Sequence, residues 1–248
     1  MSGDLPTVRW ITAFLDTARE SAEVSETFWS RVTGYHVSPS RGERDEFATL
    51  LPATGDAHLK VQRVVQTPPG GLHLDLHTDD VRGLAHRAED LGASASYLDL
   101  GYVVCGSPGG MTFCVVDHPG AMRTQPSTWP GGRSMVDEVC LDVPPSRWGE
   151  ESEFWSALTG WSPKDHDLFP EYRRIAPPQA FGLSLLLQRL DDEQPVVTGH
   201  LDLAADDFTA EAGRHMALGA RVVRHLSHWI VLEDPVGRTY CVTARTPR

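Results

Sequence analysis

The second half of the chain contains both alternating and helical patterns of apolar residues. Apolar and polar residues alternate in GHLDLAAD at 199–206, which predicts a half-buried strand. The apolar residues of GEESEFWSALTGW at 149–161 recur at helical spacing and end at Gly160, which predicts a helix. The other elements predicted for this half are strands at 139–143, 172–177 and 183–190, a helix at 208–220, and two strands within 228–244. The pattern therefore predicts two rounds of strand, helix and further strands.

The same pattern occurs in the first half. FWSRVTG at 28–34 is followed by FWSALTG at 154–160, and HLDL at 73–76 by HLDL at 200–203. The offset between matching segments is 126 residues early in each half and 127 residues later. Solenoid repeats have periods of about 20–50 residues, so this longer period indicates a duplicated domain. The chain thus contains four predicted modules.

A stretch rich in proline and glycine separates the copies and predicts a linker. We place the domains at 1–120 and 132–248, with the linker at 121–131. Both domains are large enough to build a hydrophobic core. We expect the two modules of one half to pair with each other, because the connection VVQTPPGGL between the first two modules is short.

Charge and composition narrow the classes of partner. The chain has 22 Lys and Arg against 34 Asp and Glu, a formal net charge of −12. This charge repels phosphate backbones and anionic lipid surfaces, so we expect neither nucleic acid nor a membrane as partner. No export signal is recognised, which predicts a cytoplasmic protein. We expect the protein to be either a monomer or a homodimer. The four cysteines show no CxxC spacing and are expected to be reduced.

Several of these segments together resemble the vicinal oxygen chelate superfamily. They are the FW…LTGW helix, the strand ending in Gln-Arg, the HLDL strand and the DPxGxxYCV ending. The resemblance covers nearly the whole chain, twice. It implies an α+β fold of two tandem glyoxalase-like domains, each made of two βαβββ modules whose sheets curve around a cavity. The superfamily includes lyases, isomerases, extradiol dioxygenases and metal-free sequestering proteins, so the fold does not fix the activity.

The resemblance also implies where site residues lie. Metal enzymes of the superfamily place His, Glu or Gln ligands on the first and last strands of paired modules. At these places the second half has Glu138, Gln188, His200 and Cys241, and the first half has Thr12, Gln62, His73 and Cys114. Cysteine stands where glutamate is usual, so we expect no complete metal site. Alternation along the strands adds Asp142 and Asp202 to the cavity face.

Three functions remain open from the sequence. The first is binding of a small organic molecule without a complete metal site. The second is a metal-dependent lyase, isomerase or dioxygenase that uses Glu138, Gln188 and His200 to hold a divalent ion in the second domain. The third is a metal-free enzyme with Glu138, Asp142 or His200 as general base.

We expect any chemistry to belong to the second half. Only this half has a carboxylate, Glu138, at the ligand position of its opening strand. Its counterpart is Thr12, and Asp16 lies four residues further along, about 13 Å by the rise of a strand. This distance predicts that Asp16 does not reach the same point.

Overall fold

The computed structural model describes residues 7–98, 101–117, 120–167, 169–177 and 181–248. In its first half, the first module consists of β1 (Trp10–Ala18), α1 (Ala22–Thr33), β2 (His36–Val37), β3 (Phe47–Leu51) and β4 (Leu59–Val64). The second module consists of β5 (Leu72–His77), α2 (Val81–Asp90), β6 (Ser94–Tyr97), β7 (Val103–Gly106) and β8 (Thr112–Val116).

The second half repeats this order of elements. Its first module consists of β10 (Gly132–Val143), α3 (Trp148–Thr159), β11 (Pro163–Asp165), β12 (Tyr172–Ile175) and β13 (Ser184–Arg189). Its second module consists of β14 (Thr198–Ala205), α4 (Phe208–Ala217), β15 (Arg221–His225), β16 (Trp229–Glu233) and β17 (Thr239–Thr243). Short 3-10 helices cover Arg19–Ser21, Pro69–Gly71 and Pro145–Arg147. The four predicted βαβββ modules are confirmed.

The repeated sequence motifs coincide with helix ends. Helices α1 and α3 end at Gly34 and Gly160, whose φ angles of 74° and 71° lie in the left-handed region. Glycine adopts this conformation without the steric cost of a Cβ, which explains the Gly in both FW motifs. Helices α2 and α4 begin after Asp80 and Asp207, whose carboxylates accept hydrogen bonds from amides of the first turn.

Each half forms one sheet from its own two modules. The strand order is β2-β3-β4-β1-β5-β8-β7-β6 in the first half and β11-β12-β13-β10-β14-β17-β16-β15 in the second. The opening strands of the paired modules are antiparallel neighbours, β1 with β5 and β10 with β14. This arrangement confirms that modules pair within each half.

The expected linker contains a strand that the sequence pattern did not predict. Strand β9 (Ser127–Trp129) pairs with the start of β10. The indole of Trp129 donates to the Ser134 hydroxyl at 2.8 Å, and the Arg214 guanidinium stacks on its ring at 3.8 Å. These contacts fasten the connection to the second half. The domain boundaries at 120 and 132 remain a prediction.

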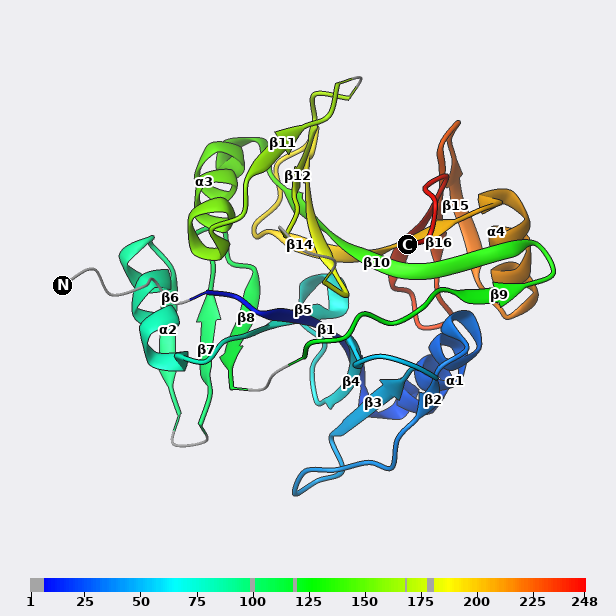
Figure 1. Ribbon diagram of the computed structural model, residues 1–248, viewed down its shortest axis with the longest axis horizontal. Helices are drawn as coiled ribbons and strands as arrows, with labels where there is room; N and C mark the ends of the chain where they lie inside the picture. The colour runs from blue at the N-terminus through cyan, green and yellow to red at the C-terminus, as the bar shows by residue number, and fades with distance from the viewer. Residues whose placement is uncertain (1–6, 99–100, 118–119, 168, 178–180) are drawn as a thin grey trace.

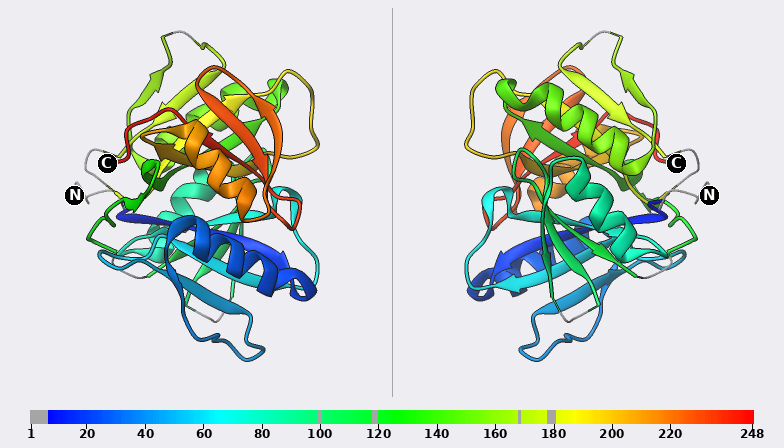
Figure 2. Two further views of the ribbon diagram at one scale, coloured as in Figure 1. Left: turned by 90° about the vertical axis from the view of Figure 1, so that its right-hand side faces the viewer. Right: turned by 90° about the vertical axis from the view of Figure 1, so that its left-hand side faces the viewer.

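The two halves share their hydrophobic core. One cluster of buried apolar residues extends through both sheets and includes residues of all four helices. Helix α1 lies beside α4, and α2 beside α3, so each helix pair joins the two halves (Figure 1; Figure 2). The sheets therefore use one face for the shared core and leave the other face available for a site. No helix of the described residues is long and apolar enough to cross a bilayer.

Candidate ligand-binding site

A cavity of about 1650 Å³ opens over the sheet of the second half, and residues of the first half, among them Asp16 and Gly71, line part of its edge. Strands β11–β12 and β15–β16 rise on either side of β10 and β14 (Figure 1). All six residues predicted for this half line the cavity: Glu138, Asp142, Gln188, His200, Asp202 and Cys241. The cavity thus lies on the sheet face that strand alternation indicates.

His200 lines the cavity and lies among other ionisable side chains. Its Nδ1 lies 2.9 Å from Oδ2 of Asp142, and its Nε2 lies 3.4 Å from Oδ1 of Asp202. The thiol of Cys241 approaches the same Nε2 at 3.6 Å. The imidazole therefore lies between two carboxylates and contacts a cysteine.

The surroundings of His200 favour its charged form. Burial alone would lower the pKa of His200, but the neighbouring Asp142, Cys140 and Cys241 raise it well above the usual value. Burial raises the pKa of the Cys241 thiol, and the adjacent Asp202 raises it further. Asp142 is the neighbour that most favours the imidazolium form of His200.

Glu138 is buried and engaged by other groups. Its Oε2 accepts a hydrogen bond of 2.9 Å from Ser184 and forms an ion pair of 2.9 Å with Arg174, and its Oε1 lies 3.3 Å from Arg245. Burial raises the pKa of Glu138, while Arg245 and Arg174 oppose that rise. The carboxylate predicted as a candidate base is thus held by two guanidinium groups.

The strand register separates the three ligands predicted for a metal. Glu138 is opposite Asp202 and Ser184, whereas His200 is opposite Cys140. Gln188 is opposite Asp142, four residues along β10 from Glu138, which is about 13 Å at the usual rise. The cluster that forms around His200 instead contains Asp202 and Cys241, whose donor atoms lie within 4.8 Å of one another. The three predicted ligands share one cavity but do not converge on one point.

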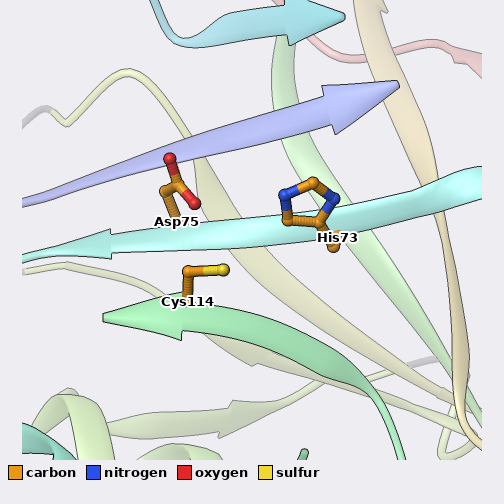
Figure 3. A group of neighbouring side chains, drawn as sticks. All are labelled: His73, Asp75 and Cys114. Carbon is orange, nitrogen blue, oxygen red and sulfur yellow. The ribbon is translucent and has the colours of Figure 1, made fainter. Parts of the chain in front are cut away.

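The first half repeats this cluster. His73 and Asp75 on β5 and Cys114 on β8 bring their donor atoms within 4.8 Å of one another (Figure 3). The Nδ1 of His73 lies 2.7 Å from Oδ2 of Asp16. Asp16 thus contacts a candidate residue of the first half, a pairing that its distance from Thr12 along the strand did not predict. The reason is that Asp16 and His73 are diagonal neighbours on antiparallel strands, close enough for their side chains to meet.

The space around the two clusters differs. In the first half Phe14 lies opposite His73 and stacks on its ring at 4.5 Å, whereas Cys140 takes the corresponding place in the second half. Lys60 lies 5.0 Å from the centre of the Phe14 ring and 3.6 Å from the Asp75 carboxylate. These larger side chains occupy space over the first cluster.

The other two candidate residues of the first half, Thr12 and Gln62, lie beside His77 and Asp16. Thr12 is fully buried and its hydroxyl lies 2.9 Å from Nε2 of His77. Gln62 lies opposite Asp16 on the parallel strand β4. Their role in ligand binding remains a prediction, as does that of the second-half residues.

The sequence reasoning missed an aromatic wall of the large cavity. Phe169, Tyr172 and Trp229 line it, with Phe169 at 5.8 Å and Tyr172 at 6.0 Å from the Trp229 ring. Tyr172 is opposite Gln188 on the neighbouring strand. The register puts Tyr172 on the sheet face of Gln188, and alternation along a single strand does not give this pairing.

The second cluster has donor atoms that suit a divalent ion. Imidazole, carboxylate and thiolate are all zinc ligands. Oδ1 of Asp202 is buried and has no hydrogen-bond partner within the described part of the chain. Asp142 contacts the other nitrogen of His200, as a carboxylate behind a metal-binding histidine does. The residues His200, Asp202 and Cys241 therefore fit an ion such as zinc.

Two curved sheets, each built from a pair of βαβββ modules, define a class of duplicated α+β proteins. The sequence matches the family model of the glyoxalase-like domain twice, over residues 12–116 and 138–243. The chain belongs to this family, as a duplicated domain of the vicinal oxygen chelate type. A search of curated proteins finds no match.

Solved structures with this fold include enzymes, one of them bound to Mn(II). The Mn(II)-bound glyoxalase from Novosphingobium aromaticivorans is 16% identical with a TM-score of 0.63, covering 96% of this chain and 83% of its own. An extradiol ring-cleaving dioxygenase from B. fuscum is 11% identical with a TM-score of 0.64, covering 99% and 74%. A variant of 4-hydroxymandelate synthase from Streptomyces coelicolor is 16% identical with a TM-score of 0.60, covering 98% and 94%. At these identities the likeness shows the fold alone.

Proposed function

We propose that the protein binds a small organic molecule in the cavity of the second half. The observation that carries this proposal is the meeting of His200, Asp202 and Cys241 on the floor of a cavity of about 1650 Å³. Binding sites for small molecules are concave and combine apolar walls with a few convergent polar groups. The cavity has both features, since aromatic rings stand beside the polar floor.

The cavity favours a flat ligand without negative charge. Nine carboxylates and six Lys or Arg side chains are among the described residues that line it. Tyr172 and Trp229 offer ring faces and edges to a planar molecule. A neutral or cationic aromatic compound with hydrogen-bond donors for Asp142 and Asp202 matches these walls.

A charge series of probes tests this function. Benzylamine, catechol and benzoate are titrated into the protein by isothermal calorimetry. We expect benzylamine and catechol to bind at least about tenfold more tightly than benzoate, a difference of about 1.4 kcal/mol. Tyr172→Ala is expected to weaken binding, whereas Tyr97→Ala, which alters an exposed tyrosine of the first half, is expected to leave it unchanged. Tighter binding of benzoate, or equal effects of the two variants, would contradict the proposal.

A second candidate function is metal-dependent catalysis in the same cavity. The buried Oδ1 of Asp202, which accepts no hydrogen bond among the described residues, lies beside His200 and Cys241 and favours this candidate. The Mn(II)-bound glyoxalase, which has the same fold, supports this second candidate function. A divalent ion would act there as a Lewis acid on an oxygen of the ligand. His200, Asp202 and Cys241 would hold the ion, while Asp142 would orient the imidazole.

Retention of zinc distinguishes metal-dependent catalysis from ligand binding without a metal. Metal content is measured by mass spectrometry after dialysis against zinc and then against buffer. If the function depends on a metal, the wild-type protein retains zinc and Cys241→Ser reduces the amount retained. Cys114→Ser, the matched change in the first half, leaves the amount unchanged. No retained zinc in the wild-type protein, or equal loss in both variants, would count against it.

A further inference from the structure

A second cavity of about 430 Å³ lies against the sheet of the second half. Four arginines line it, Arg123, Arg174, Arg245 and Arg248, together with the carboxylate of Asp137. This concentration of guanidinium groups contrasts with the acidic lining of the large cavity. The chemistry of the second cavity is therefore that of an anion site.

An irregularity in β10 sets the positions of the acidic groups. The register with β14 shifts between Val136 and Glu138, so Asp137 is an extra residue in the strand. Asp137 lines the second cavity, whereas its neighbour Glu138 lines the large one. Arg245 connects the two carboxylates, at 2.8 Å from Asp137 and 3.3 Å from Glu138.

The positive charge of the second cavity exceeds the negative charge near it. Arg245 pairs with Asp137, and Arg174 pairs with Glu138 at 2.9 Å. Arg123 and Arg248 add two positive groups, for which no ion pair is found among the described residues. The cavity therefore has more guanidinium groups than carboxylates to neutralise them.

Arg123 has an unused donor inside the protein. Its Nε is buried and has no hydrogen-bond partner within the described ranges. A buried donor without a partner costs free energy, of the order of 1–3 kcal/mol. Burial lowers the pKa of Arg123; Asp137 offsets part of that effect, and Arg174 and Arg248 add to it. A bound anion would offset the repulsion that Arg174 and Arg248 exert on Arg123.

We propose that this cavity binds a small oxyanion, a phosphate or a carboxylate, held by Arg123 together with Arg174 and Arg248. Guanidinium groups match oxyanions because their N–H groups form paired, charge-assisted hydrogen bonds. The site does not include His200 and takes the opposite charge, although Arg174 and Arg245 line both cavities. It goes beyond the proposed function, and its test does not depend on that function.

Titration with inorganic phosphate and with acetate, at constant ionic strength set by chloride, tests the site and distinguishes the two kinds of oxyanion. We expect at least one of them to bind the wild-type protein. Arg123→Gln is expected to weaken that binding at least about tenfold. The control Arg221→Gln removes the same charge at an exposed position outside both cavities and is expected to leave the affinity unchanged. No binding of either anion, or equal affinity in the two variants, would overturn the proposal.

A second measurement does not depend on the folding of a variant. Crystals of the wild-type protein are soaked in selenate, whose selenium gives an anomalous signal. We expect a peak within hydrogen-bond distance of Arg123. Peaks only at other positions, or none, would overturn the proposal.

Discussion

The indole Nε1 of Trp29, in helix α1, donates a hydrogen bond of 3.0 Å to Oδ2 of Asp234, in the turn between β16 and β17. This buried contact joins the first half to the second. On the opposite side of the molecule, Trp155 donates at 2.7 Å to Glu151 of its own helix, which accepts the amide of Gly109 from the first half. Each copy of the tryptophan thus has a buried carboxylate partner, supplied by the facing hairpin in one case and by its own helix in the other.

Asp234 depends on a buried arginine as well. Arg238 lies 2.9 Å from Asp234 and donates at 2.9 Å to both the carbonyl of Asp16 and the hydroxyl of Thr17. Arg238→Met would leave the buried carboxylate without its counter-ion, so we expect a loss of about 3–5 kcal/mol in the free energy of unfolding. Urea denaturation measures it. Arg221→Met, which breaks an exposed pair with Glu233, should cost less than about 1 kcal/mol, and equal losses would contradict this account.

Replacement by alanine is expected to have opposite effects on stability at two glycines, Gly109 and Gly213. A Cβ at Gly109 would lie 2.5 Å from Cγ2 of Val197 and 2.8 Å from Oε1 of Glu151, whereas at Gly213, inside α4, it would meet no heavy atom within 4 Å. We expect Gly109→Ala to destabilise the protein by about 1–3 kcal/mol. Gly213→Ala should stabilise it by about 0.5–1 kcal/mol, because alanine favours the helix. Thermal unfolding of both variants checks the signs, and stabilisation by Gly109→Ala would refute the close approach.

His58 predicts a pH dependence of stability. It is fully buried, with Nε2 at 3.0 Å from the carbonyl of Val136, and burial lowers the pKa of His58 to about 4. The folded state therefore holds the neutral ring. The contribution of neutral His58 to the free energy of unfolding is present above the unfolded pKa of about 6.5. It is lost as the pH falls towards the folded pKa, and the loss is up to roughly 3 kcal/mol.

The variant His58→Gln isolates this contribution, because the other titrating groups remain. Urea denaturation of both proteins is compared at neutral pH and at about pH 4.5. We expect the variant to lose less stability on acidification than the wild-type protein. Parallel losses would show that His58 does not titrate as its burial requires.

The sequence predicted the fold more completely than the site. Because matching segments lie 126 or 127 residues apart, the order of elements predicted for one half could be assigned to the other. Glycines that end helices, such as Gly34 and Gly160, marked boundaries that both halves share. Strand β9 was missed because its three residues form no periodic pattern.

The site required the register between strands. Alternation identifies the face of Glu138 and His200, but only the register shows that each is opposite a different residue. The extra residue Asp137 leaves no signal in the alternation of a single strand. Asp16 was dismissed on distance along one strand, although the repeat aligns Asp16 with Asp142 and so gave a signal for both carboxylate–histidine pairs.

The central claim is that the second half holds the ligand, and the duplication supplies a matched control. Asp202 and Asp75 occupy equivalent places beside His200 and His73, but Phe14 and Lys60 occupy the space over the first cluster. Calorimetric titration of benzylamine into Asp202→Asn and Asp75→Asn compares the two halves directly. We predict an affinity loss of about tenfold or more for Asp202→Asn and none for Asp75→Asn. Loss in Asp75→Asn with unchanged binding in Asp202→Asn would contradict the account.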